Sequence, residues 1–277
     1  MAQPRGTKRA TVHDVAREAG VSLATVDRVL NGRPGVRPVT AEKVDRAIAA
    51  LGFKRDLSAS LLARARSLSV TFLLPDGGNE FMQALRAAVS RLSHEAAGDR
   101  MALQVVQFHA FDPVALARAL DALERRSCDC AVVVASGHRA VEEAVAAATR
   151  RGIVVMTLVS DLPRSTRRHF IGIDNVAAGR TAASLMGRFL PMGGKVALIA
   201  GSLALTDHRD RQEGFVGLMA EEFPAVTCIG PFEGHDERAE TATLATGLFA
   251  AHPDLAGIYN LGAGNAGLIA ALEDSGR

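Results

Sequence analysis

The sequence has no tryptophan, a single tyrosine and three cysteines among its 277 residues. An odd number of cysteines without a CxxC pair argues against a disulfide framework and against a zinc site. No apolar run is long enough to span a bilayer, and the basic N-terminus lacks the apolar stretch of a secretory signal. We therefore expect a cytoplasmic protein with reduced thiols, no bound metal and no cofactor.

Apolar residues make up 48% of the chain, which is enough to bury a sizeable core. Much of this content is alanine and valine, a composition that suits helices packed on a buried parallel sheet. The length predicts two or three domains.

The charge is unevenly distributed. Residues 1–66 hold 13 lysines and arginines against 6 acidic residues, a surplus of 7, whereas the whole chain carries +2, so the remainder carries −5. A basic small part joined to an acidic large part is typical of a nucleic-acid binder with a separate regulatory body. Charge alone leaves open a chance cluster on a solvated surface.

Three short helices are predicted before residue 54. Thr11 is a good N-cap for the first, Asp14 completes a capping box, and Gly20 ends the helix. Ser22 is placed to cap the second helix and Thr40 the third. The Gly-Val-Ser junction between the first two helices is typical of a helix-turn-helix, whose second helix enters the major groove of DNA.

This region resembles a known family. The stretch VHDVAREAGVSLATVDRVLNGRPGVRPVTAEKVDRAIAALGF is similar, without a gap, to the headpiece of the lac-repressor/galactose-repressor family. The pattern DVAxxAGVSxxTVxRVLN is matched from Asp14 to Asn31, and Asp27 stands where the family usually has serine. The resemblance implies a sequence-specific DNA-binding transcription regulator, most often a repressor.

The resemblance also implies roles within the headpiece. Leu23 and Ala24 would open the recognition helix and offer apolar contacts, while Arg28 on the same face suits a bidentate contact with guanine. Ser22 and Thr25 would bind phosphates. Asp27 either orients a neighbouring arginine or is a solvated residue without a role. The predicted DNA-binding residues are Thr11, Ser22, Leu23, Ala24, Thr25, Arg28, Asn31, Leu62 and Ala63.

The last two of these lie in a linker, residues 54–67. The resemblance implies a hinge helix that folds on the operator and wedges Leu62 and Ala63 into the minor groove. The Pro-Asn pair usual before the hinge is replaced by Arg55 and Asp56, and Asp56 can still cap a helix. A simple amphipathic linker is the alternative.

From residue 68 onward, apolar strand-like runs alternate with helical patterns. The first pair is LSVTFLLP and EFMQALRAAVSRLSHEA, and a later strand, KVALIAG, is followed by a helix expected at about residues 212–222. Strands alternating with helices predict parallel βαβ units and a doubly wound α/β sheet. Ligands bind such sheets at the carboxyl ends of the strands.

Polar side chains gather at these predicted strand ends. Carboxylates, amides and an arginine around an apolar platform suit a polyhydroxylated ligand, because each hydroxyl both donates and accepts. For any single residue, a capping role or a surface charge is the alternative, and the grouping favours a site. The predicted ligand-binding residues are Asp76, Asn79, Phe81, Ser136, His138, Asp161, Asp174, Arg211 and Asn260.

The body resembles the periplasmic sugar-binding-protein fold, in which two lobes close on a sugar. The segments TLVSDLP, IGIDNVAAGRTAA and HRDRQEGF carry this resemblance. It implies that Arg211 pairs with sugar hydroxyls, that Asp161 accepts from them, and that Phe81 stacks on the sugar face. It also implies roughly 60 further residues in a complete body, so we expect either that the sequence is a fragment or that its second lobe is incomplete.

The expected organisation is an all-α helix-turn-helix headpiece (1–53), a hinge (54–67) and a two-lobed α/β body, with lobes at 68–168 and 169–277. The expected function is a repressor whose binding to operator DNA is controlled by a small sugar or polyol, acting as a homodimer on a palindromic site.

Several other function classes are alternatives to this one. An enzyme is disfavoured because no GxGxxG follows the first strand and neither a GK[ST] loop nor a nucleophile elbow is found. A transport binding protein, a nucleoside-sensing regulator and a ligand-independent repressor are the remaining alternatives.

Overall fold

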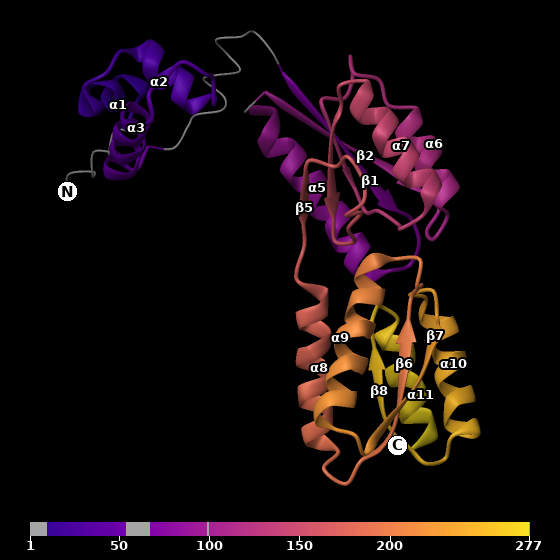
Figure 1. The fold of residues 1–277 in the computed structure, drawn as a ribbon. Coiled ribbons are helices and arrows are strands. Elements are labelled where there is room, and N and C mark those ends of the chain that lie inside the picture. The colour runs from indigo at the N-terminus through magenta and orange to yellow at the C-terminus, as the bar shows by residue number, and fades with distance from the viewer. Residues whose placement is uncertain (1–9, 54–66, 99, 277) are drawn as a thin grey trace, which may run out of the picture. The chain divides into compact units, whose positions relative to one another are not determined.

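The protein is described by a computed structural model covering residues 10–53, 67–98 and 100–276. It divides into two compact units, residues 1–64 and 65–277, whose folds Figure 1 shows. No helix in the described ranges is both long and apolar enough to cross a membrane.

Three helices form the described part of the first unit: α1 (Val12–Ala19), α2 (Leu23–Leu30) and α3 (Pro38–Leu51). They enclose a core made of one or two buried side chains from each helix and the residue that follows α3. Its members are Val15, Ala16, Val26, Val44, Ala47 and Phe53. The predicted all-α headpiece is confirmed.

The third helix begins earlier than expected. It starts at Pro38, its N-cap is Arg37, and no side chain caps it, so the prediction that Thr40 is the N-cap is wrong. Proline suits the first helical position because its fixed φ is already helical and its missing N–H would have no partner inside the helix.

The first lobe of the second unit is built on five described strands. They are β1 (Leu68–Pro75), β2 (Met101–Phe108), β3 (Cys130–Val133), β4 (Val154–Leu158) and β5 (His169–Ile171), paired in parallel in the order β2-β1-β3-β4-β5. The helices of this lobe are α5 (Glu80–Gly98), α6 (Pro113–Asp121) and α7 (Arg139–Arg150).

The helices of the first lobe cover both faces of its sheet. Leu73 packs with side chains of α6 and α7, such as Leu116 and Val141, whereas its neighbour Leu74 packs with Met82 of α5. Adjacent residues of a strand point to opposite faces, so α5 covers one face and α6 and α7 the other. This is the predicted doubly wound arrangement.

The second lobe holds a three-stranded parallel sheet within the described residues. Its strands are β6 (Gly194–Ala200), β7 (Val226–Glu233) and β8 (Leu255–Asn260), in the order β7-β6-β8. Its helices are α8 (Asn175–Phe189), α9 (Thr206–Glu222), α10 (Arg238–Ala251) and α11 (Asn265–Ser275).

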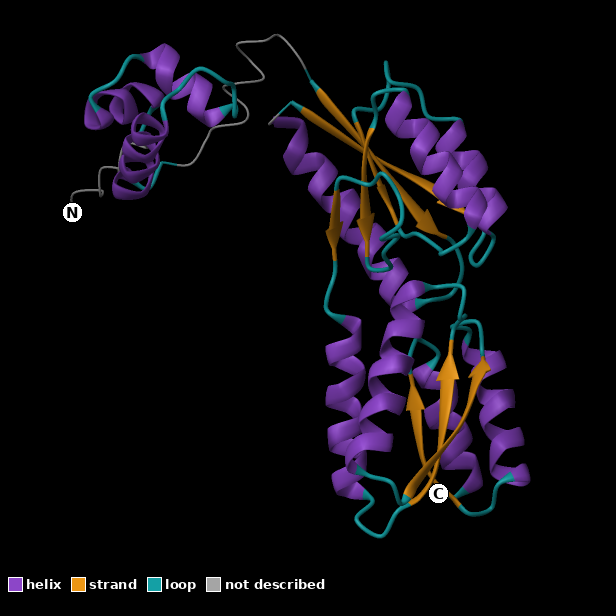
Figure 2. Ribbon diagram, in the orientation of Figure 1, coloured by secondary structure: helices purple, strands orange, loops and turns teal. Residues whose placement is uncertain are grey.

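The second lobe is also covered on both faces. Leu198 packs with Ala183 of α8 and Phe215 of α9, whereas Ile199 packs with Leu248 of α10. In Figure 2 the strand arrows of the two sheets point toward each other, so the carboxyl ends of both sheets meet in the middle of the unit.

Strand β5 pairs with β4, and the first sheet extends to Ile171. The lobe boundary between residues 168 and 169 stays a prediction.

The expected start of one helix in the second lobe is corrected. Helix α9 begins at Thr206 rather than near residue 212. Its first turn is polar and is typical of a loop, but the N–H of Thr206 donates to Ser160 Oγ of the first lobe at 3.2 Å, which satisfies one of the N–H groups at the helix start.

Helices α8 and α9 approach each other through glycine. A Cβ atom on Gly214 of α9 would lie 2.1 Å from the carbonyl oxygen of Val176 on α8. We therefore expect Gly214→Ala to force the helices apart and to lower the free energy of unfolding by about 1–3 kcal/mol, as measured by urea denaturation.

Gly217 on the same helix is the matched control. Nothing lies within 4 Å of a Cβ atom placed there. Gly217→Ala should stabilise the protein by about 0.5–1 kcal/mol, because alanine is the better helix former. Equal effects of the two substitutions would contradict the close approach of the helices.

Candidate DNA interface and ligand cavity

Side-chain caps stabilise the starts of α1 and α2, and a glycine ends α1. Thr11 and Asp14 form a capping box, in which the Thr11 N–H donates to Asp14 Oδ2 at 2.9 Å and the Asp14 N–H donates to Thr11 Oγ1 at 3.3 Å. Gly20 ends α1 with a φ of 64°, a conformation that glycine adopts without strain. Ser22 caps α2 by accepting from the Thr25 N–H at 3.2 Å. Both predicted caps are confirmed.

Helix α2 presents an open face. Val26 points into the core, while Leu23, Ala24 and Arg28 are exposed. Ala24 and Arg28 are four residues apart and so lie on the same side of the helix. Within the described residues, the Arg28 side chain has no hydrogen bond or ion pair, so its guanidinium is available to a partner. Ser22 and Thr25 are joined through their hydroxyls at 2.9 Å, beside this face.

Asp27 orients an arginine. Its Oδ2 lies 3.1 Å from Arg33 Nη1, and its Oδ1 accepts from the Asn31 amide at 2.8 Å. Of the two interpretations offered for Asp27, the geometry favours the orienting role. Arg33 is therefore added to the candidate interface, although its spacing from α2 did not indicate such a role in the sequence. Leu62 and Ala63 lie outside the described residues.

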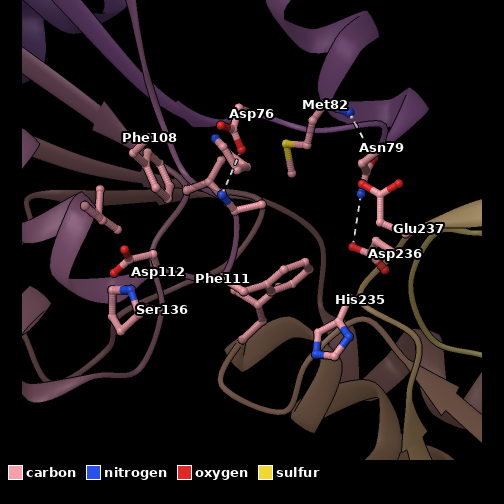
Figure 3. Close-up of a pocket in the computed structure, with 16 residues that line it drawn as sticks. Asp76, Asn79, Met82, Phe108, Phe111, Asp112, Ser136, His235, Asp236 and Glu237 are labelled. Atoms are coloured by element: carbon pink, nitrogen blue, oxygen red, sulfur yellow. Dashed lines mark hydrogen bonds between the residues drawn. The ribbon is translucent and has the colours of Figure 1, made fainter. Parts of the chain in front are cut away.

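A cavity lies between the two lobes of the second unit, where the strands of both sheets end (Figure 3). The space within it that a water molecule can reach is about 60 Å³, and part of the cavity is open to solvent. The lining residues are Pro75, Asp76, Asn79, Met82, Phe108, Ala110, Phe111, Asp112, Pro113, Leu116, Val134, Ser136, Leu205, His235, Asp236 and Glu237.

The two lobes are joined at the rim of this cavity. The Asn79 amide donates to Asp236 Oδ2 at 3.0 Å, and the Gly78 N–H donates to Glu237 Oε1 at 3.1 Å. The rings of Phe111 and His235 meet edge to face, with their centroids 5.7 Å apart, as Figure 3 shows. The walls of the cavity are thus held in place from both sides.

Three of the predicted ligand residues line the cavity. Asp76 accepts from the Ala110 N–H at 2.9 Å, and Asn79 makes the bond between the lobes described above. Ser136 is only 8% exposed, and its hydroxyl has no hydrogen-bond partner among the described residues. A buried hydroxyl without a partner costs free energy, which a ligand group could recover.

Three others lie outside the lining, and two of them cap helices. Phe81 is 57% exposed, and Phe111 supplies an aromatic wall instead. His138 caps α7 by accepting from the Ala140 N–H, and Asp174 caps α8 by accepting from the Ala177 N–H.

Asp161 is engaged by a neighbour. Arg167 donates to both of its oxygens, at 2.5 and 2.6 Å, and Thr157 Oγ1 donates at 2.6 Å. Burial by itself would raise the pKa of Asp161, but the hydrogen bonds from Arg167 and Thr157 outweigh it and hold the pKa below its ordinary value. Asp161 is therefore ionised and paired.

Arg211 and Asn260 stabilise the edge of the second sheet. Arg211 Nη1 donates to the Leu261 carbonyl at 2.6 Å, and the Asn260 amide donates to the Ala263 carbonyl at 2.8 Å. Arg211 lies on α9, which begins ahead of the helix start that the sequence predicted. Neither residue lines the cavity.

Sequence reasoning missed the residues that follow β2 and β7. Phe111 and Asp112 come directly after β2, and His235, Asp236 and Glu237 come directly after β7. A signal was present, because Asp112 and the run His235-Asp236-Glu237 are polar residues close after the carboxyl end of a strand. Neither segment was among the predicted ligand-binding residues.

Two family models match the chain. Residues 70–277 match the periplasmic binding protein domain, and residues 11–56 match the bacterial regulatory proteins of the lacI family.

Curated relatives include three regulators. Catabolite control protein A of Priestia megaterium is 41% identical over 83 residues, which cover 30% of this chain and 25% of that protein. The HTH-type transcriptional regulator GalS of Salmonella typhimurium is 28% identical over 76% of this chain and 60% of its own length. The regulator GalR of Escherichia coli is 27% identical over 86% of this chain and 68% of its own length. The chain thus spans less than two thirds of the first two relatives.

Solved structures resemble the second unit. A solute-binding protein of Burkholderia graminis in complex with D-arabinose has a TM-score of 0.68 and 25% identity, covering 75% of this chain and 71% of that one. A solute-binding protein of Mycobacterium smegmatis with bound glycerol has a TM-score of 0.68 and 25% identity, covering 76% and 72%. The glucose-galactose binding protein of Geobacillus stearothermophilus shares the fold at 20% identity, with a TM-score of 0.67 and coverage of 76% and 75%.

The Asp161–Arg167 pair gives the first lobe an acid-sensitive contact. The pKa of Asp161 is lowered in the folded protein. The ionised Asp161 therefore stabilises the fold fully above the ordinary carboxyl pKa of 3.8, and this contribution to the free energy of unfolding is lost as the pH falls through the lowered pKa. We expect Asp161→Asn to cost about 1–3 kcal/mol at neutral pH and to lose less stability on acidification than the parent protein, measured by urea denaturation across pH.

Asp254 offers a matched control, since it pairs with Lys195 at 2.9 Å on an exposed surface. Asp254→Asn should have a much smaller effect, because water screens exposed pairs. An Asp161 variant with the acid sensitivity of the parent would contradict the stabilising role of this pair.

Proposed function

Because the chain belongs to the periplasmic-binding-protein-domain family and carries a lacI-family DNA-binding domain ahead of that domain, we propose that it is a sequence-specific transcription repressor whose operator binding is controlled by a small sugar or polyol. The observation that carries this proposal is the combination, in one chain, of an open recognition-helix face and a cavity between two lobes. It is a binding protein of the cytoplasm rather than an enzyme.

The first unit is proposed to read the operator through α2. Arg28 would contact guanine, Leu23 and Ala24 would offer apolar contacts to bases, and Ser22 and Thr25 would bind phosphates. The positive surplus of residues 1–66 would attract the phosphate backbone. Two copies on a palindromic site would give a homodimer with one first unit for each half-site.

The second unit is proposed to hold the effector in its cavity. Two solved neighbours of this fold contain D-arabinose and glycerol, which supports a sugar or polyol. Binding between the lobes would change their relative orientation and thereby decide whether residues 54–67 fold as a hinge on DNA, with Leu62 and Ala63 in the minor groove. We propose that the ligand is an inducer, which means that its binding releases the protein from the operator.

The role of Arg28 is tested by two substitutions. Arg28→Ala should weaken binding to an operator recovered by selection from random duplexes by about 1–3 kcal/mol and should relax specificity at one base pair. Arg28→Lys should lose a similar share of specificity but keep more of the non-specific affinity, because lysine retains the charge without the bidentate fork. Fluorescence anisotropy with operator and random duplexes measures both affinities.

An unchanged ratio of specific to non-specific affinity in both variants would overturn the assignment of Arg28. Loss of all DNA affinity in both would instead point to a folding defect, which circular dichroism of the same samples detects.

Control by ligand is tested on the full chain bound to its operator. Neutral and charged sugars and polyols are titrated into the complex, and at least one should weaken operator affinity about fivefold or more, the usual range of coupling between two sites. The same compound should raise the melting temperature of the free protein. Operator binding that none of them alters would contradict control by a sugar or polyol.

A further inference from the structure

The cavity between the lobes carries a surplus of negative charge. Asp76 and Asp112 contribute carboxylates from the first lobe, and Asp236 and Glu237 contribute carboxylates from the second. Figure 3 shows these side chains around the cavity. Among the described residues, no lysine or arginine lines it. Four carboxylates thus line the cavity together with one basic side chain, His235.

The hydrogen bonds of these carboxylates leave their charge in place. Asp112 Oδ1 accepts from the N–H groups of Val114 and Ala115 at 2.9 Å, and Glu237 Oε1 accepts from Gly78. Backbone N–H groups are neutral partners that favour the ionised carboxylate. The bond from Ala115 is the largest of the effects that hold the pKa of Asp112 below its ordinary value.

Several basic side chains lie at or beside the cavity, and of these His235 belongs to its lining. His235 lines the cavity, but its Nδ1 lies 2.8 Å from Glu240, a further carboxylate. Arg86 donates to the carbonyl oxygens of Pro75 and Gly77, and Arg209 donates to a threonine hydroxyl on its own helix. His109 lies 3.4 Å from Asp76 without lining the cavity.

Two further features point to a ligand. The Ser136 hydroxyl is buried in the lining and lacks a partner among the described residues, so it can pair with a ligand hydroxyl. Phe108 and Phe111 supply aromatic rings next to the carboxylates. The face of an aromatic ring attracts a cation, and the attraction grows when water is excluded.

We propose that the ligand of this cavity is a small polyol that carries a protonated amine, as in an amino sugar, and that phosphorylated and acidic sugars are excluded. This inference rests on the proposed function, since it takes the cavity to be the effector site. A cavity lined by four carboxylates and, among the described residues, by no lysine or arginine lowers the free energy of a bound cation and raises that of a bound anion. The ligand hydroxyls would pair with Ser136 and with the free lone pairs of the carboxylates.

The test compares compounds that differ mainly in charge. D-Glucosamine, D-glucose and D-glucose 6-phosphate, with D-galactosamine and D-galactose as a second pair, are titrated against the full chain by calorimetry and thermal shift. An amine should bind more tightly than its neutral parent, the phosphate should not bind, and the advantage of the amine should shrink as salt rises. Equal affinity of a neutral parent, binding of the phosphate, or no binding of either amine would overturn the proposal.

Variants place the effect in the cavity. Asp112→Asn removes the charge and keeps the N-cap of α6, because asparagine also caps helices well. Affinity for the amine should fall about two- to fivefold, the range measured for one exposed charge pair, while affinity for the neutral parent stays unchanged. Asp121→Asn, at the other end of the same helix and outside the lining, is the matched control and should change neither affinity. Equal losses in the two variants would contradict a role of the cavity.

Operator binding, followed in the same titrations, separates this proposal from the proposed function. An amine that binds through Asp112 but leaves operator affinity unchanged would support the cavity chemistry and contradict regulation. A neutral sugar that releases the operator would support regulation and overturn the charge selectivity.

Discussion

The second unit depends on a single constraint, the parallel direction of its strands. All strands of a parallel sheet end at the same edge, and the loops that follow them are brought together there. In this protein the two sheets turn those edges toward each other. Loops that follow β1, β2, β3, β6 and β7 consequently line one cavity, although they lie far apart along the chain. The helices on both faces of each sheet bury the apolar strands and leave that edge open.

Much of the fold could be predicted because it depends on local pattern. The capping box of Thr11 and Asp14 and the cap at Ser22 are set by residues three apart, so the sequence contains both partners side by side. The alternation of strands and helices likewise predicts the doubly wound sheets. The start of α9 could not be predicted in this way, because its first N–H is satisfied by Ser160, which lies 46 residues away.

The candidate ligand site was predicted less well for the same physical reason. Asp161 and Arg211 have the chemistry of sugar ligands, but whether they are free depends on Arg167 and on the carbonyl of Leu261, contacts that only the folded chain reveals. Asn79 and Asp236 are 157 residues apart and still bond each other. Residue type and strand-end position therefore identified Asp76, Asn79 and Ser136, whereas the opposite wall of the cavity required the fold.

The hydrogen bond between Ser160 and Thr206 links the start of α9, in the second lobe, to the position of the first lobe. The N–H of Thr206, the first residue of α9, donates to Ser160 in the first lobe. Separation of the lobes therefore leaves this donor without its protein partner. The first turn of α9 also contains the buried Asp207 and His208. Opening of the lobes would therefore cost the start of α9 one of its hydrogen bonds, next to two buried polar side chains.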